Sequence, residues 1–371
     1  MITKDFKGEP ISRLGMGNMR LPTVGQGFGA AIDYEKAAEI IDYAMKNGIT
    51  YFDTAYVYNG SEKFLGTVLP KYDRSSFKLA TKYMASANPD YKAVFEEQLQ
   101  RLNTDYIDFY LLHGIMNQEN IDSYIGRGCL EYFIEQKEKG RIKQLGFSSH
   151  ASVPLLKQMI GKYKWDFAQI QLNYLDWEMQ DAKGQYEALT EAGIPVVVME
   201  PVRGGRLASL SEKADAVLKE AHPDWSIASW ALRWLLRLDN VQVILSGMST
   251  MDQIIDNVNT FNTEPLSDAD AKILQKACDM FKGEINVPCT GCRYCCDDCP
   301  MSIEIPKVMQ IYNQYKLGGG MALMGLGALK TGPKDCVGCG NCQKHCPQGI
   351  EIPKVMAELA EILNKMPGPR P

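Results

Sequence analysis

A cysteine pattern that occurs twice near the C-terminus constrains this chain more than any other feature. Each copy reads C-x2-C-x2-C-x3-C-P and is followed closely by the same phrase, Ile-Glu-Ile-Pro-Lys-Val-Met. The first copy consists of Cys289, Cys292, Cys295 and Cys299. The second consists of Cys336, Cys339, Cys342 and Cys346. Because proline suits the first turn of a helix, we expect a helix to begin after each Cys-Pro.

This spacing is typical of the ligands of [4Fe-4S] clusters. Three thiolates two residues apart can bind three corners of one cluster, whereas the fourth, next to proline, binds the other cluster in two-cluster proteins. We therefore expect a first cluster on Cys289, Cys292, Cys295 and Cys346. We expect a second on Cys336, Cys339, Cys342 and Cys299.

Two alternatives concern these cysteines. Cys-x2-Cys pairs also bind structural zinc, so two zinc sites are the competing interpretation. Cys296 is a surplus thiol that could replace Cys295 as a ligand or could take no part in binding. The crowding of nine cysteines between residues 289 and 346, out of eleven in the chain, points to metal rather than to disulfides.

Upstream of the cysteines, short apolar runs alternate with amphipathic helical stretches. We predict strands at residues 11–20, 49–55, 77–83, 106–113, 142–149, 167–173, 195–202 and 241–248. Eight strands that alternate with helices predict an α/β fold, a (β/α)8 TIM barrel, and a doubly wound open sheet is the alternative. We expect the barrel to occupy residues 1–285 and a small α-helical iron–sulfur domain to occupy residues 286–371.

Charge and hydropathy limit the partners and the cellular location that we expect. The net charge of −5 gives no reason to expect nucleic acid or an anionic membrane as a partner. The N-terminus lacks the apolar run of a signal peptide, and no apolar stretch is long enough to span a bilayer. We therefore expect a cytoplasmic protein.

Four polar residues follow successive strands of the predicted barrel. Asp53 ends the second strand, Tyr58 lies in the loop after it, Lys82 ends the third strand and His113 ends the fourth. Each has an ordinary structural explanation when taken alone. Chemistry in such barrels is carried out where the strands end, so four of these residues together indicate a catalytic site.

Asp53, Tyr58, Lys82 and His113 match the catalytic tetrad of the aldo-keto reductases, and LGMGNMR and GFSSH also resemble that family. The cysteine region resembles the α-helical variety of bacterial two-cluster ferredoxin domains. The whole chain is thus similar to the ferredoxin-tailed branch of the family. The resemblance implies an oxidoreductase that reduces an aldehyde or ketone with NAD(P)H and carries two [4Fe-4S] clusters for electron transfer.

The resemblance also implies a cofactor site on the later strands. Ser148, Ser149 and Gln169 would contact the nicotinamide carboxamide, and Met199 stands where the family places an aromatic ring. Gly247 and Gln253 stand near the places of the phosphate contacts, and Asn257 would face the adenine. No cation is evident there, so the choice between NADH and NADPH stays open. Arg203 and Arg206 could substitute, although we expect them to lie in a solvated loop.

The chemistry of carbonyl reduction assigns a role to each member of the tetrad. An ammonium near Tyr58 should lower the pKa of its phenol, so Lys82 would make Tyr58 a better proton donor. Asp53 would hold Lys82, and a neutral His113 would donate an N–H to the carbonyl oxygen. Clusters pass single electrons, so coupling them to hydride transfer implies a flavin mediator or a redox partner protein. The alternatives are clusters with a structural role, and an electron-transfer protein or redox sensor whose barrel reduces no carbonyl.

Overall fold

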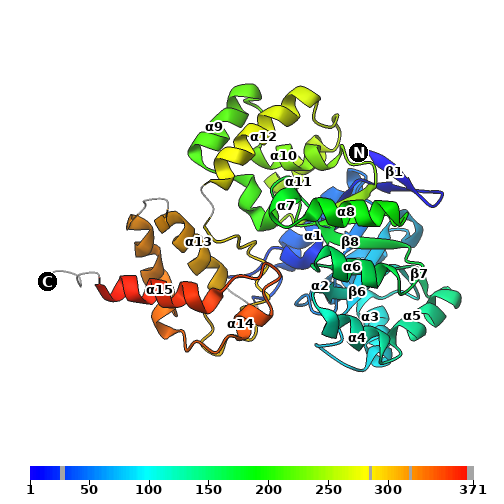
Figure 1. The fold of residues 1–371 in the computed structure, drawn as a ribbon. Coiled ribbons are helices and arrows are strands. Elements are labelled where there is room, and N and C mark those ends of the chain that lie inside the picture. Colours follow the sequence, from blue (N-terminus) through cyan, green and yellow to red (C-terminus); the bar gives the residue numbers. More distant parts are fainter. Residues whose placement is uncertain (26–29, 284–285, 317–319, 366–371) are drawn as a thin grey trace. The chain divides into compact units, whose positions relative to one another are not determined.

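The computed structural model describes residues 1–25, 30–283, 286–316 and 320–365 (Figure 1). The chain forms two compact units. Met1–Val202 and His222–Lys272 make up one, the barrel unit, and Arg203–Ala221 and Ile273–Pro371 make up the other, the tail unit. Part of the region expected to form the barrel therefore groups with the cysteine-rich tail.

Eight parallel strands close into a barrel in the order β10-β3-β4-β5-β6-β7-β8-β9. They are β3 (Leu14–Gly17), β4 (Tyr51–Asp53), β5 (Lys78–Tyr83), β6 (Ile107–Ile115), β7 (Ile142–Ser149), β8 (Phe167–Gln171), β9 (Val196–Met199) and β10 (Val241–Ser246). Each predicted apolar run supplies one of them, so the predicted (β/α)8 barrel is confirmed. Pairing of β10 with β3 closes the sheet and rules out the open doubly wound alternative.

Side chains alternate between the two faces of each strand, and this alternation builds two cores. Tyr51, Ala80, Phe109, Phe167 and Val197 point to the barrel interior and pack together. Their neighbours along the strands face outward and pack on the helices. The residue two positions after each of these interior residues points to the same face, nearer the carboxyl end of the strand. On four of the strands these residues are Asp53, Lys82, Gln169 and Met199.

A hairpin that the sequence analysis missed precedes the barrel. Strands β1 (Thr3–Phe6) and β2 (Glu9–Ser12) pair in antiparallel fashion. The predicted strand at residues 11–20 is therefore two strands, β2 and β3, separated by Arg13. Phe6 belongs to the interior core, and its ring lies 5.2 Å from that of Phe109.

Helices cover the outside of the barrel. In the barrel unit they are α1 (Tyr34–Lys46), α2 (Ser61–Val68), α3 (Tyr91–Leu102), α4 (Gln118–Ile125), α5 (Cys129–Glu138), α6 (Val153–Ile160), α7 (Asp176–Met179), α8 (Ala182–Glu191), α10 (Ile227–Leu235) and α11 (Met251–Thr260). Short 3-10 turns η1 (Asn18–Arg20), η2 (Leu69–Lys71) and η3 (Arg74–Ser76) connect some of them to the strands. Helix α1 is an example of how the sequence determines such a helix. Asp33 caps its first turn, and its buried face consists of Ala37, Ile40, Ile41 and Ala44.

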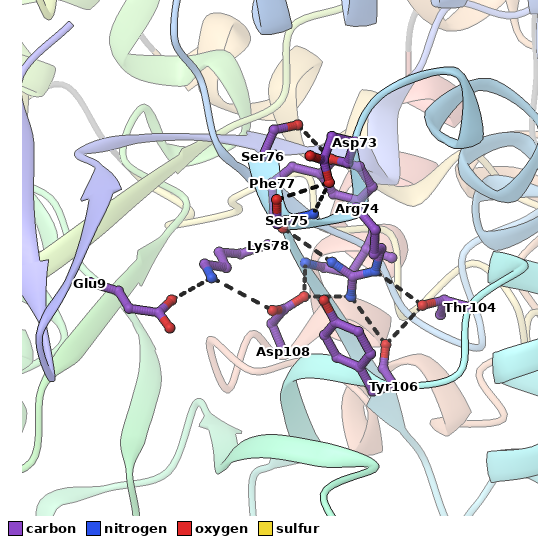
Figure 2. Close-up of polar contacts among 11 residues, drawn as sticks. Glu9, Asp73, Arg74, Ser75, Ser76, Phe77, Lys78, Thr104, Tyr106 and Asp108 are labelled. Atoms are coloured by element: carbon purple, nitrogen blue, oxygen red, sulfur yellow. Dashed lines mark hydrogen bonds and ion pairs between the residues drawn. The ribbon is translucent and has the colours of Figure 1, made fainter.

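A polar network joins the amino ends of β5 and β6 (Figure 2). Asp108 accepts hydrogen bonds from Arg74 Nη2 at 2.6 Å and from the backbone N–H of Leu79 at 2.9 Å. The Arg74 guanidinium also lies 4.1 Å from the centre of the Tyr106 ring. Asp108 is buried, so these partners offset the cost of removing its charge from water.

The tail unit is built mostly from helices and turns. It contains η4 (Arg203–Ala208), α9 (Glu212–Ala221), most of α12 (Asp268–Lys282), α13 (Ile305–Lys316), η5 (Gly320–Ala328), η6 (Pro333–Asp335), α14 (Asn341–Lys344) and α15 (Ile352–Lys365). Helices α13 and α15 begin where the sequence placed them, shortly after each Cys-Pro. Val308, Met309, Met356 and Leu359 on these helices belong to a small apolar core shared with several cysteines. Among the helices of the described residues, none is long and apolar enough to cross a membrane.

We predict that Asp108→Ala destabilises the barrel unit by about 3 kcal/mol, because it leaves a buried N–H and a partly buried guanidinium without their acceptor. All five tryptophans lie in the barrel unit, so denaturant unfolding followed by their fluorescence measures this change. Glu135→Gln removes an exposed pair with Lys139 and is the control, with no measurable change in stability expected. Equal effects of the two substitutions would contradict the role given to Asp108.

Candidate active site and cluster cavities

A buried ion pair forms the base of the candidate active site. Lys82 on β5 donates to Asp53 Oδ1 on the neighbouring strand β4 at 2.6 Å and to the backbone oxygen of Thr54 at 2.7 Å. Both charged side chains are almost fully buried. The parallel pairing of β4 with β5 brings them together, because both residues face the interior at the carboxyl ends of their strands.

His113 lies on the interior face of β6, two residues after Leu111, which belongs to the interior core. The register between β6 and β7 shifts between Leu112 and Ile115, and Gly114 adopts a positive φ of 72°. This bulge changes the face that the strand presents after His113, since Ile115 belongs to the outer core. His113 itself is buried. Nδ1 of His113 has no hydrogen-bond partner among the described residues.

Tyr58 lies in the loop between β4 and α2. Its backbone N–H donates to Ala55 O at 3.0 Å, and its own carbonyl accepts from Ser61 N at 3.1 Å, so the loop is a tight turn. The Tyr58 ring lies 5.8 Å from the His113 ring, edge to face, and 4.9 Å from Lys82 Nζ. The structure thus brings all four sequence-predicted residues of the tetrad together.

Burial dominates the electrostatics of these four residues. It raises the pKa of the Tyr58 phenol well above 10, and the charges of Asp53 and Glu200 add to the rise. The expected lowering of that pKa by Lys82 is therefore not found, because burial and these two negative charges all favour the neutral phenol. Burial also lowers the pKa of Lys82 and raises that of Asp53, and their mutual attraction opposes both shifts.

Burial also has the largest effect on the pKa of His113, and here the direction is the one expected from the sequence. Burial lowers its pKa well below 6.5, and the charges of Lys82 and His150 lower it further. Burial also lowers the pKa of His150 to about 4. A neutral His113 at physiological pH agrees with the expectation from the sequence.

Behind the tetrad lies a buried polar network that the sequence analysis missed. Glu62 Oε1 accepts from Thr81 Oγ1 at 2.6 Å and from Gln98 Nε2 at 2.7 Å. Gln98 Nε2 also lies 3.1 Å from the backbone oxygen of Lys82. The signal was present, since Gln98 interrupts the apolar face that Val94, Phe95, Leu99 and Leu102 form on α3.

Residues expected to contact the nicotinamide ring lie at the same end of the barrel. Ser148 Oγ accepts from Gly114 N at 2.8 Å, and Ser149 Oγ accepts from Ala151 N at 3.0 Å, so both hydroxyls also brace the local backbone. Gln169 Nε2 lies 3.5 Å from Met199 Sδ. The Gln169 Oε1 atom is buried with no partner among the described residues, so an amide donor of a ligand would satisfy it.

The residues expected near the adenine half lie around the end of β10 and on α11. Asn257 is buried and donates to Ser246 Oγ at 2.9 Å. Gln253 Oε1 accepts from Ser249 N at 2.7 Å and so stabilises the turn before α11. Gly247 is exposed, and the stem of Arg20 lies beside it. Arg20 is a cation near this position that the sequence analysis did not identify.

Arg203 and Arg206 belong to the tail unit and do not form a solvated loop. Arg203 is buried, and its Nη2 donates to the backbone oxygen of Pro288 at 2.8 Å. The Arg206 guanidinium lies 4.9 Å from the centre of the Phe281 ring. The expectation of a solvated loop is therefore wrong, because both guanidinium groups contact other parts of the tail unit.

Two cavities in the tail unit are each lined by four cysteines. The first cavity is lined by Cys289, Cys292, Cys295 and Cys346. The second is lined by Cys299, Cys336, Cys339 and Cys342. These are the two crossed sets expected from the spacing, and four thiols facing one cavity suit a [4Fe-4S] cluster. Cys296 lines neither cavity and faces Cys295 and Arg293 instead.

A closed α/β barrel with a Lys-Asp pair, a tyrosine and a histidine at its carboxyl end, joined to a tail with two four-cysteine cavities, defines a TIM-barrel oxidoreductase with an iron–sulfur module. The chain belongs to the aldo/keto reductase family, whose model matches residues 13–279. The model of a 4Fe-4S dicluster domain matches residues 288–351. That second match favours iron–sulfur clusters over the zinc alternative.

Individual relatives agree with the family. The chain is similar to an uncharacterized oxidoreductase, YqkF, of Bacillus subtilis, with 29% identity across 71% of this chain and 92% of the relative. It is 28% identical to the methylglyoxal reductase YeaE of Escherichia coli over 72% of this chain and 95% of that one. The holo form of aldo-keto reductase AKR11C1 from Bacillus halodurans superposes with a TM-score of 0.62 at 30% identity, over 75% of this chain and 96% of that one.

The depressed pKa of His113 predicts a pH-dependent stability. Below about pH 6.5 the unfolded chain binds a proton at this residue that the folded barrel does not bind, so the free energy of unfolding falls as the pH decreases. Between pH 7.5 and pH 5.5 the loss attributable to His113 is about 1.4 kcal/mol. Unfolding followed by tryptophan fluorescence in wild type and His113→Asn measures it as the difference between their pH profiles. Parallel profiles would show that the pKa of His113 is the same in the folded and unfolded states, which would contradict the expected shift.

Proposed function

We propose that this protein is an NAD(P)H-dependent reductase of aldehydes or ketones, with Asp53, Tyr58, Lys82 and His113 as its catalytic residues. The observation that carries the proposal is the buried Lys82–Asp53 pair with the Tyr58 and His113 rings beside it. Kinship with the family, including a relative named as a methylglyoxal reductase, supports a small carbonyl compound as the substrate class.

The residues at the carboxyl end of the barrel fit a nicotinamide cofactor. Gln169 Oε1 offers a buried acceptor for the carboxamide, beside Ser148 and Ser149. Met199 would pack against the ring, while Gly247, Gln253 and Asn257 would lie along the adenine half. Bound there, the reduced cofactor supplies a hydride to the carbonyl carbon. The proposal leaves the choice between NADH and NADPH to a kinetic comparison.

Tyr58 supplies the proton that carbonyl reduction requires at oxygen. Its raised pKa keeps the phenol protonated at any physiological pH, so the donor is always loaded. As the proton leaves, negative charge forms on the phenol, and the Lys82 ammonium, 4.9 Å from the centre of the Tyr58 ring, would stabilise that charge. Asp53 keeps Lys82 charged and oriented, and neutral His113 donates an N–H that aligns the carbonyl oxygen.

The tail would hold two [4Fe-4S] clusters on the eight cysteines that line the two cavities. Such clusters exchange single electrons, so we further propose that the tail transfers electrons to or from a redox partner protein or a flavin mediator. A location in the cytoplasm would keep these thiols reduced for cluster binding, so the cytoplasmic location is part of the proposal. Residues 286–371 would form the separately folding iron–sulfur domain, with residues 1–285 as the reductase domain.

Tyr58→Phe should reduce the rate of carbonyl reduction about 100-fold or more, because it removes the proton donor and leaves the packing of the ring. Methylglyoxal with NADH and with NADPH is the first assay, and reduction of the clusters by dithionite should be unchanged. Tyr56→Phe is the matched control. Tyr56 lies in the same loop as Tyr58 but outside the tetrad, and its hydroxyl donates to Glu97 on α3 at 3.0 Å. Full activity of Tyr58→Phe would refute the mechanism and favour a barrel that serves another purpose.

Removal of the clusters should unfold the tail and leave the barrel folded. Thiolate ligation contributes folding free energy to small metal domains, and the core of the tail includes the cysteines themselves. After anaerobic chelation, limited proteolysis should cleave residues 286–365 first, while tryptophan fluorescence of the barrel unit stays native. Simultaneous loss of both signals would contradict two separately folding domains.

A further inference from the structure

The two cavities of the tail are copies of one another with a few differences. Each residue that lines the first cavity has an equivalent, at the same place in the duplicated motif, that lines the second. The four cysteines and the three isoleucines of the first lining have identical equivalents in the second, as do Pro306 and Met309. Because the frameworks match, any difference in chemistry between the sites arises from the remaining positions and from their surroundings.

Three positions differ, and all three differ in the same direction. Thr290, Arg293 and Gln348 line the first cavity. Their equivalents in the second cavity are Val337, Gly340 and Met301. At each of these positions the first cavity has a side chain that can donate a hydrogen bond, and one of the three carries a positive charge. The equivalent residue of the second cavity is apolar or a glycine.

The backbone at Arg293 indicates that its side chain is required. Arg293 has a positive φ of 74°, and Gly340 has a φ of 76° at the equivalent position. Glycine adopts this conformation freely, whereas a residue with a Cβ is disfavoured there. The first motif therefore keeps an arginine where the second motif has the residue that suits the backbone better.

Thr290 gives an independent indication. Its side chain is 3% exposed, and its Oγ1 has no hydrogen-bond partner among the described residues. A buried hydroxyl that faces a cavity and has no partner is explained if a group bound in that cavity accepts its hydrogen bond. Val337, at the equivalent position, has no such group and is 63% exposed.

We propose that these three residues give the cluster in the first cavity the higher reduction potential of the two. Reduction adds a negative charge to a cluster, and hydrogen bonds to its sulfur atoms and a nearby cation stabilise that charge. An electron that a one-electron donor delivers to the second cavity therefore passes to the first, where it is more stable. This inference rests on the proposed function, since it requires both cavities to hold clusters.

Two features of the surroundings reduce the difference. Glu304 pairs with Arg293 at 2.8 Å and offsets part of its charge. Cys339 in the second cavity is exposed, and solvent near a cluster also stabilises its reduced form. Exchange of residues between the two cavities separates the side-chain effect from these features, because the surroundings stay the same.

The test is an anaerobic redox titration of the full-length protein, followed by EPR, with iron and sulfide counted in every sample. Wild type should show two reduction steps. Arg293→Gly, which the backbone tolerates, should shift only the step at higher potential, toward more negative values. Gly340→Arg should shift only the other step, toward more positive values, and space is available because a Cβ there meets no atom within 4 Å.

Thr290→Val and Val337→Thr repeat the exchange without a change in charge and should shift the same two steps in the same directions. Lys307→Ala removes an exposed cation that lines neither cavity and should move neither step. With about eight irons bound, one shared potential in wild type, or an Arg293→Gly variant that moves the lower step or none, would overturn the inference. Absence of iron and sulfide would instead refute the proposed clusters.

Discussion

A lysine and an aspartate that are almost fully buried must be paired, because either charge alone in the barrel would cost several kcal/mol. The contact between Lys82 and Asp53 therefore fixes the carboxyl ends of β4 and β5 against each other. Tyr58 and His113 are arranged around that contact, and the network of Glu62 and Gln98 supports it from behind. The same burial that makes the pair necessary raises the pKa of Tyr58 and lowers that of His113, so one desolvated region sets the protonation states of the whole site.

Much of this arrangement could be predicted from the sequence, since alternation of apolar runs and helices identified all eight strands of the barrel. The tetrad could be found because strand ends converge in a barrel. Three features could not be found in this way. The hairpin β1–β2 merged with the first barrel strand, the bulge at His113 depends on pairing with β7, and the sign of the Tyr58 pKa shift depends on burial, which a pattern of residues does not measure. Arg203 was misjudged for the same reason, because its partner Pro288 is distant in sequence.

The tail presents the opposite situation, because ligand spacing alone predicted which cysteines line each cavity. Spacing could not show how the two sites differ. Although the motif is duplicated, three lining positions carry polar side chains in the first cavity and apolar residues or glycine in the second. The two sites also differ at the backbone, since Arg293 has a positive φ that is strained for its side chain, whereas Gly340 adopts the same φ freely at the equivalent position. Identical ligand sets can therefore serve different purposes within one small domain.

The crossed arrangement of the cysteines has a consequence for the way this protein is made. The first cavity includes Cys346 from the second motif, and the second cavity includes Cys299 from the first. If these sets bind the clusters, neither site can be completed while the second motif is still inside the ribosome. The barrel, which precedes the tail, can fold during synthesis, whereas both clusters must be inserted late and nearly together. A cell that lacks iron would then accumulate a folded barrel with an unfinished tail, rather than a protein with one cluster.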